Sequence, residues 1–296
     1  MKFYIAEAFA ENIFAGNPAG VVITGGDFLD DNTCISTAAE LRYSETAFIK
    51  RNGPCDFTIR YFTPVSEVDL CGHATIASFY VLKHSGIIND GNFTARTKAG
   101  NLNINVKNNT VMMDMARPVH IATISDKTEI NRLYKILGAE NIPESGMLPM
   151  IISTGLPDII LPVSGRAELN SLAPDMNSLS ALSEEYSVVG VHPFAPDASN
   201  EVTAHARDFA PLYGINEEAA TGTASGALAY YLYLNKLITK DTDLCFIQGE
   251  AMNRASKIAA RIRNDGSIQV GGSAAVLAAM TTRSLEGSID TADAMR

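Results

Sequence analysis

The sequence predicts an α+β protein with two pseudosymmetric, β-barrel-like domains, each wrapped around a central helix. Two observations indicate this fold in the 296-residue chain: an internal repeat at about half the chain length, and an apolar helix among short strands in each copy. A helix that is apolar on all sides must be buried. A sheet that wraps around the helix buries it economically.

The repeat covers most of the chain. In both copies, at 61–82 and 208–232, an aromatic-x-Pro segment leads through a short loop to a glycine and a small-residue helix. Further matches follow in the same order: 16–23 with 155–163, 31–48 with 176–194, and TKAG (97–100) with IQG (247–249). We infer homologous domains at 1–118 and 119–296, joined near 115–125, with the tail 280–296 left unassigned.

Each half is predicted to hold the same elements in the same order. A strand and an extended apolar run come first, then an amphipathic helix, two strands, the central helix and further alternating strands. In the first half these are 3–8, 16–23, 30–41, 46–50, 57–62, a helix from 72, 102–106 and 111–115. In the second half they are 150–154, 155–163, 176–186, 188–194, 201–209, a helix from 222, 257–262 and 267–272. Small residues in the central helices let the strands approach closely.

Composition excludes several classes of function. With 23 basic and 33 acidic residues, the formal net charge of -10 argues against binding to nucleic acid or anionic membranes. No apolar run reaches the length of a membrane span, and Glu7 and Glu11 lie where a signal peptide would be apolar. We therefore expect a cytoplasmic protein.

The cysteines agree with this expectation. They are scattered without CxxC spacing, at Cys34, Cys55, Cys71 and Cys245. Such a pattern is typical of a reduced protein, and we expect no metal site.

The starts of the two central helices are candidates for an anion site. A pseudo-twofold axis would bring Gly72-His73 and Gly222-Thr223 together, and each start presents unpaired backbone N–H groups and the positive end of a helix dipole. An acidic protein could bind an acidic ligand there without Lys or Arg. The alternative is that both glycines only allow a tight turn into the helix.

Differences between the two copies point to residues with a special role. His73 in the first copy matches Thr223 in the second, and Cys71 matches Thr221. Glu45 precedes an apolar strand where the second copy has no carboxylate. A carboxyl that faces an apolar cleft loses hydration, so Glu45 could exchange protons near neutral pH.

Ordinary structural roles remain open for the same residues. Glu45 could be a solvated strand-end glutamate, and His73 a helix-start histidine that bonds locally. Glu217-Glu218 could be an acidic turn that complements the helix dipole.

Five segments occur in the order typical of one family: GNPAGVV (16–22), LRYSETAFI (41–49), IRYFTPVSEVDLCGHATIAS (59–78), FAPLYGINEEAATGTASGAL (209–228) and QGEAMNRASKI (248–258). With them the sequence resembles the PhzF-like, or phenazine biosynthesis-like, family of isomerases over about residues 1–277. The tail from 280 matches nothing in the family.

The resemblance implies a diaminopimelate-epimerase-like fold, a homodimer, and proton transfer on an unsaturated, carboxylate-bearing metabolite without a cofactor. It implies Glu45 as acid/base and His73 as the site histidine, with Glu218 and Thr223 completing the catalytic set. The substrate carboxylate would lie against Gly72, Gly222 and Thr223, and Ser44 completes the expected binding residues.

Three positions depart from the family pattern Glu-Asp-Pro-x-Thr-Gly-Ser-Ala, which reads EEAATGTA at 217–224. Glu218 replaces the site aspartate, Ala219 the proline and Thr223 the serine. The functional groups are kept, but the carboxyl has a longer stem and the turn loses a fixed φ. Because proton transfer depends on close positioning, we expect a substrate other than the phenazine precursor.

Three hypotheses follow from the sequence. The first is a Glu45-dependent isomerase. The second is a two-base racemase or epimerase, which needs a thiol from each half, whereas here Cys71 faces Thr221. The third is a non-catalytic binding or interaction protein on the same scaffold.

Overall fold

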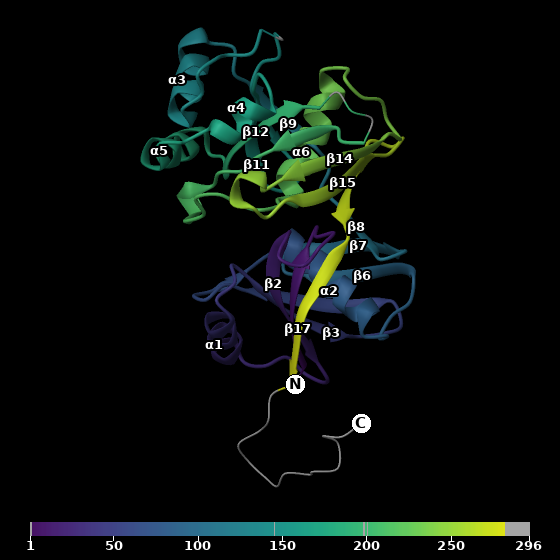
Figure 1. Cartoon of the computed structure of the whole chain (residues 1–296). Coiled ribbons are helices and arrows are strands. Elements are labelled where there is room, and N and C mark those ends of the chain that lie inside the picture. Colours follow the sequence, from purple (N-terminus) through teal and green to yellow (C-terminus); the bar gives the residue numbers. More distant parts are fainter. Residues whose placement is uncertain (1, 145, 198, 200, 282–296) are drawn as a thin grey trace.

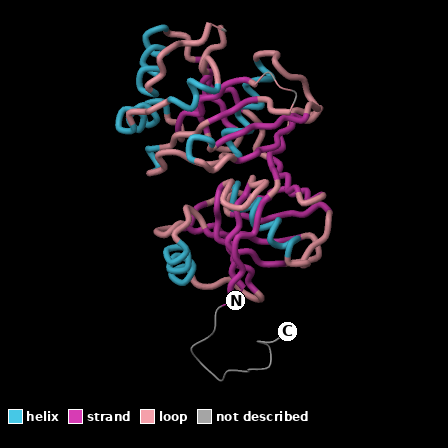
Figure 2. The backbone as a smooth tube through the Cα atoms, in the orientation of Figure 1, coloured by secondary structure: helices cyan, strands magenta, loops and turns pink. Residues whose placement is uncertain are grey.

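The computed structural model describes residues 2–144, 146–197, 199 and 201–281. This part of the chain forms two halves that lie one above the other, connected by strands (Figure 1). Each half is a curved, mixed sheet with a helix inside it, as the backbone tube also shows (Figure 2). The predicted α+β fold with two helix-filled, barrel-like halves is confirmed.

The first half contains eight strands and two helices before the chain crosses to the second. The strands are β1 (Lys2–Ala8), β2 (Asn17–Thr24), β3 (Thr46–Arg51), β4 (Asp56–Phe62), β5 (Glu67–Val68), β6 (Gly91–Thr97), β7 (Gly100–Lys107) and β8 (Thr110–Asp114). The helices are α1 (Asp31–Leu41), which lies outside the sheet, and α2 (Gly72–His84), which lies inside it.

Helix α2 is buried because its sequence offers no polar face. Its interior residues from His73 to Phe79 are all buried, and the helix contacts β1, β2, β3 and β8. Phe79 packs edge-on against Phe57 with ring centroids 5.5 Å apart. Burial of one such side chain contributes about 1.5–3 kcal/mol to the stability of the folded state. The polar Thr75 is accommodated by a 2.6 Å hydrogen bond between its hydroxyl and that of Tyr61.

The second half repeats this plan around α6. Its strands are β9 (Val119–Thr123), β10 (Met150–Ser153), β11 (Pro157–Pro162), β12 (Gly190–Pro196), β13 (Ala204–Ala206), β14 (Asp243–Gln248), β15 (Ser256–Ile262) and β16 (Ile268–Gly272). Its helices are α3 (Lys127–Leu137), α4 (Arg166–Ser171), α5 (Met176–Tyr186) and α6 (Gly222–Leu234), with short 3-10 turns at Pro211–Tyr213 and Glu250–Met252. Helix α3 and helix α4 have no counterpart in the first half and pack with α5 over a second apolar cluster.

Strand pairing follows the internal repeat. The parallel pair β2–β3 matches the parallel pair β11–β12, and the parallel pair β4–β6 matches β13–β14. The antiparallel pairs β1–β2 and β6–β7 correspond in the same way to β10–β11 and β14–β15. The predicted strand 201–209 is shorter than expected, because only Ala204–Ala206 forms a ladder before an isolated bridge at Phe209.

Two strand crossings tie the halves together. Strand β8 pairs antiparallel with β16 of the other half. The last described strand, β17 (Ala274–Thr281), leaves the second half, pairs with β1 and contacts α2 (Figure 1). Residues 274–281 therefore lie in the first half, although the division at residue 118 assigned them to the second. The boundary itself stays a prediction, and residues 282–296 of the unassigned tail lie outside the described residues.

No helix within the described ranges is both long enough and apolar enough to cross a lipid bilayer.

Candidate active site

Glu45 is positioned by the end of α1 and the start of β3. Helix α1 ends at Leu41, and the left-handed backbone of its C-cap residue Arg42 (φ 60°) turns the chain toward the sheet. The carbonyl of Glu45 then accepts a 3.2 Å hydrogen bond from the N–H of Gly20 on β2. Its carboxyl oxygen Oε2 is fully buried and has no hydrogen-bond partner among the described residues. A buried carboxyl oxygen without a hydrogen-bond partner is unusual and needs an explanation.

His73, the second residue of α2, lies between two carboxyls. Its Nε2 is 3.4 Å from Oε2 of Glu45, and its Nδ1 is 3.8 Å from Oε1 of Glu218. The ring is 7% exposed. The Sγ atom of Cys71 lies 3.4 Å from Nδ1 and 3.7 Å from Nε2. One cluster of titratable groups thus contains residues from both halves.

Glu218 is held in place from both halves. Asn17, at the start of β2, donates to Oε1 of Glu218 at 2.7 Å and to the carbonyl of Ala220 at 2.9 Å. Gln248, at the end of β14, donates to the carbonyl of Glu218 at 2.8 Å and accepts from the N–H of Thr221 at 3.1 Å. These bonds fix the loop that enters α6.

The neighbouring Glu217 has a different role. Both of its carboxyl oxygens accept from the guanidinium of Arg207 at 2.8 Å, so it forms a bidentate ion pair away from His73. This partner, rather than the dipole of α6, accounts for the position of Glu217.

The starts of α2 and α6 lie close together. The two helices are in contact, and the approach of Glu218 to His73 brings the loop before α6 to the first turn of α2. The residues that precede the helices, Cys71 and Thr221, are extended, and neither side chain caps the first-turn N–H groups. The N-cap side chains therefore leave the first-turn N–H groups of both helices uncapped, and the binding of an anion there stays a prediction.

Burial shifts the pKa values in this cluster. Desolvation raises the pKa of Glu218 to about 8, and the charges of the nearby Glu45 and Asp208 act in the same direction. The hydrogen bond from Asn17 opposes this shift. Burial lowers the pKa of His73, although the charge of Glu45 opposes this shift. Burial also raises the pKa of the Cys71 thiol well above its usual value. Burial thus favours the neutral forms of Glu218, His73 and Cys71.

A buried polar network supports the loop before α6. Asp208 accepts from the hydroxyl of Thr221 at 2.7 Å and lies 3.1 Å from Nδ1 of His192. Asp158 is nearby, and burial together with the charge of Asp208 raises the pKa of Asp158 well above its usual value. The network fixes the position of Thr221, the counterpart of Cys71 in the repeat.

Comparison with known proteins identifies the family of this chain. The model of the phenazine biosynthesis-like protein family, PhzC-PhzF, matches residues 6–280. The chain belongs to this family. An uncharacterized isomerase of Clostridium acetobutylicum is 34% identical over 293 residues, covering 93% of this chain and 96% of that protein.

Solved structures of the PhzF family share the fold. A PhzF-family phenazine biosynthesis protein from Bacillus anthracis aligns with a TM-score of 0.84 and 26% identity, over 95% of this chain and 98% of that one. A hydroxyproline epimerase from Agrobacterium vitis aligns with a TM-score of 0.60 and 12% identity, over 95% and 91% of the chains. This second likeness extends to the fold alone.

Of the residues expected in this PhzF-family site, the structure brings Glu45, His73 and Glu218 together. Ser44 is exposed, and Thr223 is half-buried, with its carbonyl accepting from the hydroxyl of Thr154 at 2.8 Å. No hydrogen bond or ion pair within the described ranges joins the side chain of Ser44 or Thr223 to the other three.

Sequence reasoning missed the residues that position Glu218. Asn17 is the second residue of the run GNPAGVV and the first of β2, and a polar residue at the start of a buried strand could have indicated its role. Asp208 breaks the apolar pattern of its segment in a similar way. Gln248 gave no separate signal, because its part depends on how β14 meets the loop before α6.

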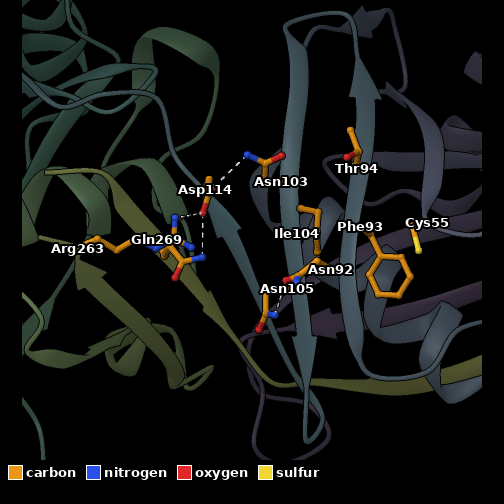
Figure 3. Close-up of a pocket in the computed structure, with 10 residues that line it drawn as sticks. All are labelled: Cys55, Asn92, Phe93, Thr94, Asn103, Ile104, Asn105, Asp114, Arg263 and Gln269. Carbon is orange, nitrogen blue, oxygen red and sulfur yellow. Dashed lines mark hydrogen bonds and ion pairs between the residues drawn. The ribbon is translucent and has the colours of Figure 1, made fainter. Parts of the chain in front are cut away.

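The pocket in Figure 3 lies elsewhere and shares no residue with this cluster. It is found beside the β8–β16 junction, where Asp114 accepts from Asn103 and Gln269 and pairs with Arg263 (Figure 3). These contacts satisfy polar groups at the joint between the halves. The pocket is therefore separate from the cluster that contains Glu45, His73 and Glu218.

Proposed function

We propose that this protein is an isomerase that moves a proton on a small, unsaturated, carboxylate-bearing metabolite, with Glu45 as acid/base. One observation carries the proposal: the buried, unpartnered Oε2 of Glu45 lies 3.4 Å from His73 where two helix starts meet. The names of related proteins support the isomerase class.

The substrate carboxylate would bind to the backbone N–H groups at Gly72-His73 and Gly222-Thr223. The positive ends of the two helix dipoles favour a negative charge there. A protonated Glu218 favours the same ligand, because it adds no negative charge at neutral pH. A protein with a net charge of -10 could thus bind an anion through local donors.

Glu45 would remove a proton from one carbon of the substrate and return it to another. His73 would hold Glu45 through Nε2, and its Nδ1 would face the carboxyl of Glu218. The distances of 3.4 and 3.8 Å exceed those of good hydrogen bonds, and we expect them to shorten around a bound substrate. In this proposal the proton transfer needs only these side chains.

A racemase or epimerase that uses two thiols is the less favoured alternative. Such chemistry needs an acid/base group on each face of the substrate. Here Cys71 is matched by Thr221, whose hydroxyl donates to Asp208. The second half therefore lacks the thiol that this mechanism requires.

Exchange of solvent deuterium tests the proposal against a non-catalytic binding role. The protein is incubated in D₂O with small unsaturated carboxylates, and deuterium on carbon is followed by NMR. An isomerase of this kind exchanges at least one of these acids. Saturable binding of an acid without deuterium incorporation or isomerisation would favour the non-catalytic role.

A further inference from the structure

The cluster around His73 holds three chemically different potential metal ligands. Sγ of Cys71, one ring nitrogen of His73 and one carboxyl oxygen of Glu45 lie within 4.8 Å of one another. Within the described ranges, no other group of three His, Cys, Asp or Glu side chains converges as closely. Cys71 and His73 are both buried, so the group forms a preorganised set and not a surface patch.

We propose that Glu45, Cys71 and His73 form a binding site for a thiophilic divalent cation such as Zn²⁺, which would occupy the site in place of the substrate.

The distances suit such an ion. Zn²⁺ binds Cys, His and carboxylate ligands at about 2.0–2.3 Å, so the ligand atoms of a tetrahedral site lie about 3.3–3.8 Å apart. Here Sγ of Cys71 is 3.7 Å from Nε2 of His73, and that nitrogen is 3.4 Å from Oε2 of Glu45. Sγ of Cys71 also lies within 4.8 Å of one carboxyl oxygen of Glu45.

The absence of a hydrogen-bond partner for Oε2 of Glu45 also points to a ligand. A buried acceptor without a donor costs free energy, and a cation would supply the missing interaction. Charge also balances: one divalent cation neutralises one thiolate and one carboxylate, and the thiol proton is released to solvent on binding.

A supporting carboxyl is already present beside the histidine. Oε1 of Glu218 lies 3.8 Å from Nδ1 of His73, and the 2.7 Å hydrogen bond from Asn17 fixes that oxygen. Metal-binding histidines usually donate their second ring N–H to such a partner, which orients the ring.

Binding would inhibit the enzyme, because a carboxylate that coordinates a cation cannot accept a proton from the substrate. This consequence rests on the proposed function, whereas cation binding does not. Soft divalent cations would inhibit, and Mg²⁺, which prefers oxygen ligands, would not.

Titration of the tag-free full chain with Co²⁺ tests the site without any assay of turnover. Cobalt bound to a thiolate gives a charge-transfer absorption band in the near ultraviolet. We expect the band in the wild-type protein, its loss when Zn²⁺ is added, and its absence in Cys71→Ser. The matched control Cys55→Ser, at an exposed cysteine, should keep the band.

A second variant covers the case in which Cys71→Ser does not fold. Glu218→Gln keeps the thiol but weakens the support of His73, so Co²⁺ should bind about 10–100-fold more weakly with the band retained. A wild-type protein without the band, a band that survives in Cys71→Ser, or an unchanged affinity in Glu218→Gln would overturn the proposal. A cobalt band in a protein that exchanges no substrate would leave the metal site intact and count against the isomerase alone.

Discussion

The protonation of Glu218 controls the charge beside Glu45. Because its pKa is raised to about 8, Glu218 gains a negative charge only as the pH passes that value. This charge would repel both Glu45 and the carboxylate of the substrate. We predict that kcat/KM falls as the pH rises through about 8 in the wild-type protein, and that this fall is absent in Glu218→Gln. The exposed control Glu40→Gln should keep the wild-type profile.

The same residue affects stability. The pKa of Glu218 is raised from 4.5 to about 8, so the folded state keeps a proton that the unfolded chain releases. The stability it contributes is complete below about pH 4.5 and is lost as the pH rises to about 8. Urea unfolding at about pH 5 and at about pH 8 gives the free energy of unfolding at each pH. Between these two pH values, this free energy should fall more in the wild-type protein than in Glu218→Gln. Equal losses would show that Glu218 does not keep its proton on folding.

Cys71 distinguishes proton transfer by a single carboxylate from a two-thiol mechanism. A lone thiol cannot remove and return a proton on opposite faces of one carbon. We predict that Cys71→Ser retains most of the turnover of the wild-type protein and loses some stability through altered packing. Loss of turnover in a folded Cys71→Ser protein would revive the racemase hypothesis.

At the scale of elements, Gly20 sets the position of Glu45. A Cβ atom at Gly20 would lie 2.6 Å from Oγ1 of Thr46 and 2.8 Å from Cδ1 of Leu41. Gly20→Ala must therefore push β2 away from the start of β3, and we predict a loss of about 1–3 kcal/mol in the free energy of unfolding. In the control Gly25→Ala, the added Cβ meets nothing within 4 Å. Equal thermal stability of the two variants would contradict this role.

Most elements could be predicted from the sequence because their signals are local. The helix Met176–Tyr186 has the predicted bounds, and the small-residue helices begin at Gly72 and Gly222 as expected. The amphipathic helix Lys127–Leu137 was missed because it has no copy in the first half and the repeat guided the prediction.

The candidate site was predictable only where the two copies differ. Glu45 and His73 break the repeat, so the comparison of the halves found them. The contact of Asn17 with Glu218 spans 201 positions of sequence and depends on how the halves meet, which no local pattern encodes.

At the scale of the whole molecule, an ion pair joins the halves near the site. Glu7, which is 1% exposed, accepts from Arg254 at 2.8 Å, and Arg254 also donates to the carbonyl of Gly16 beside Asn17. Arg254→Ala leaves the buried carboxylate of Glu7 with the N–H of Phe14 but without a cation, and we predict a loss of about 3 kcal/mol in the free energy of unfolding.

The control for this change is Lys257→Ala. Its ion pair with Glu11 joins side chains that are 49% and 60% exposed. Such surface pairs contribute about 0–1 kcal/mol. Denaturant unfolding of both variants measures the loss in the free energy of unfolding. A similar loss in each would show that the buried Glu7–Arg254 pair contributes no more than the exposed pair.

The crossing of β17 back to β1 could not be predicted, because the repeat places each strand in the half of the sequence to which it belongs. The equivalent pair in the second half is β9 with β10, and β9 follows β8, the last strand of the first half. The homodimer and the cytoplasmic location stay predictions.

The most direct test of the central claim is deuterium exchange by Glu45→Gln, measured on a substrate that the wild-type protein exchanges. The substitution keeps the shape of Glu45 and removes its capacity to carry a proton. We predict a rate about 10²–10⁴-fold below that of the wild-type protein, while Glu40→Gln exchanges at the wild-type rate. A folded Glu45→Gln protein that exchanges deuterium as fast as the wild-type protein would contradict the assignment of Glu45 as the acid/base.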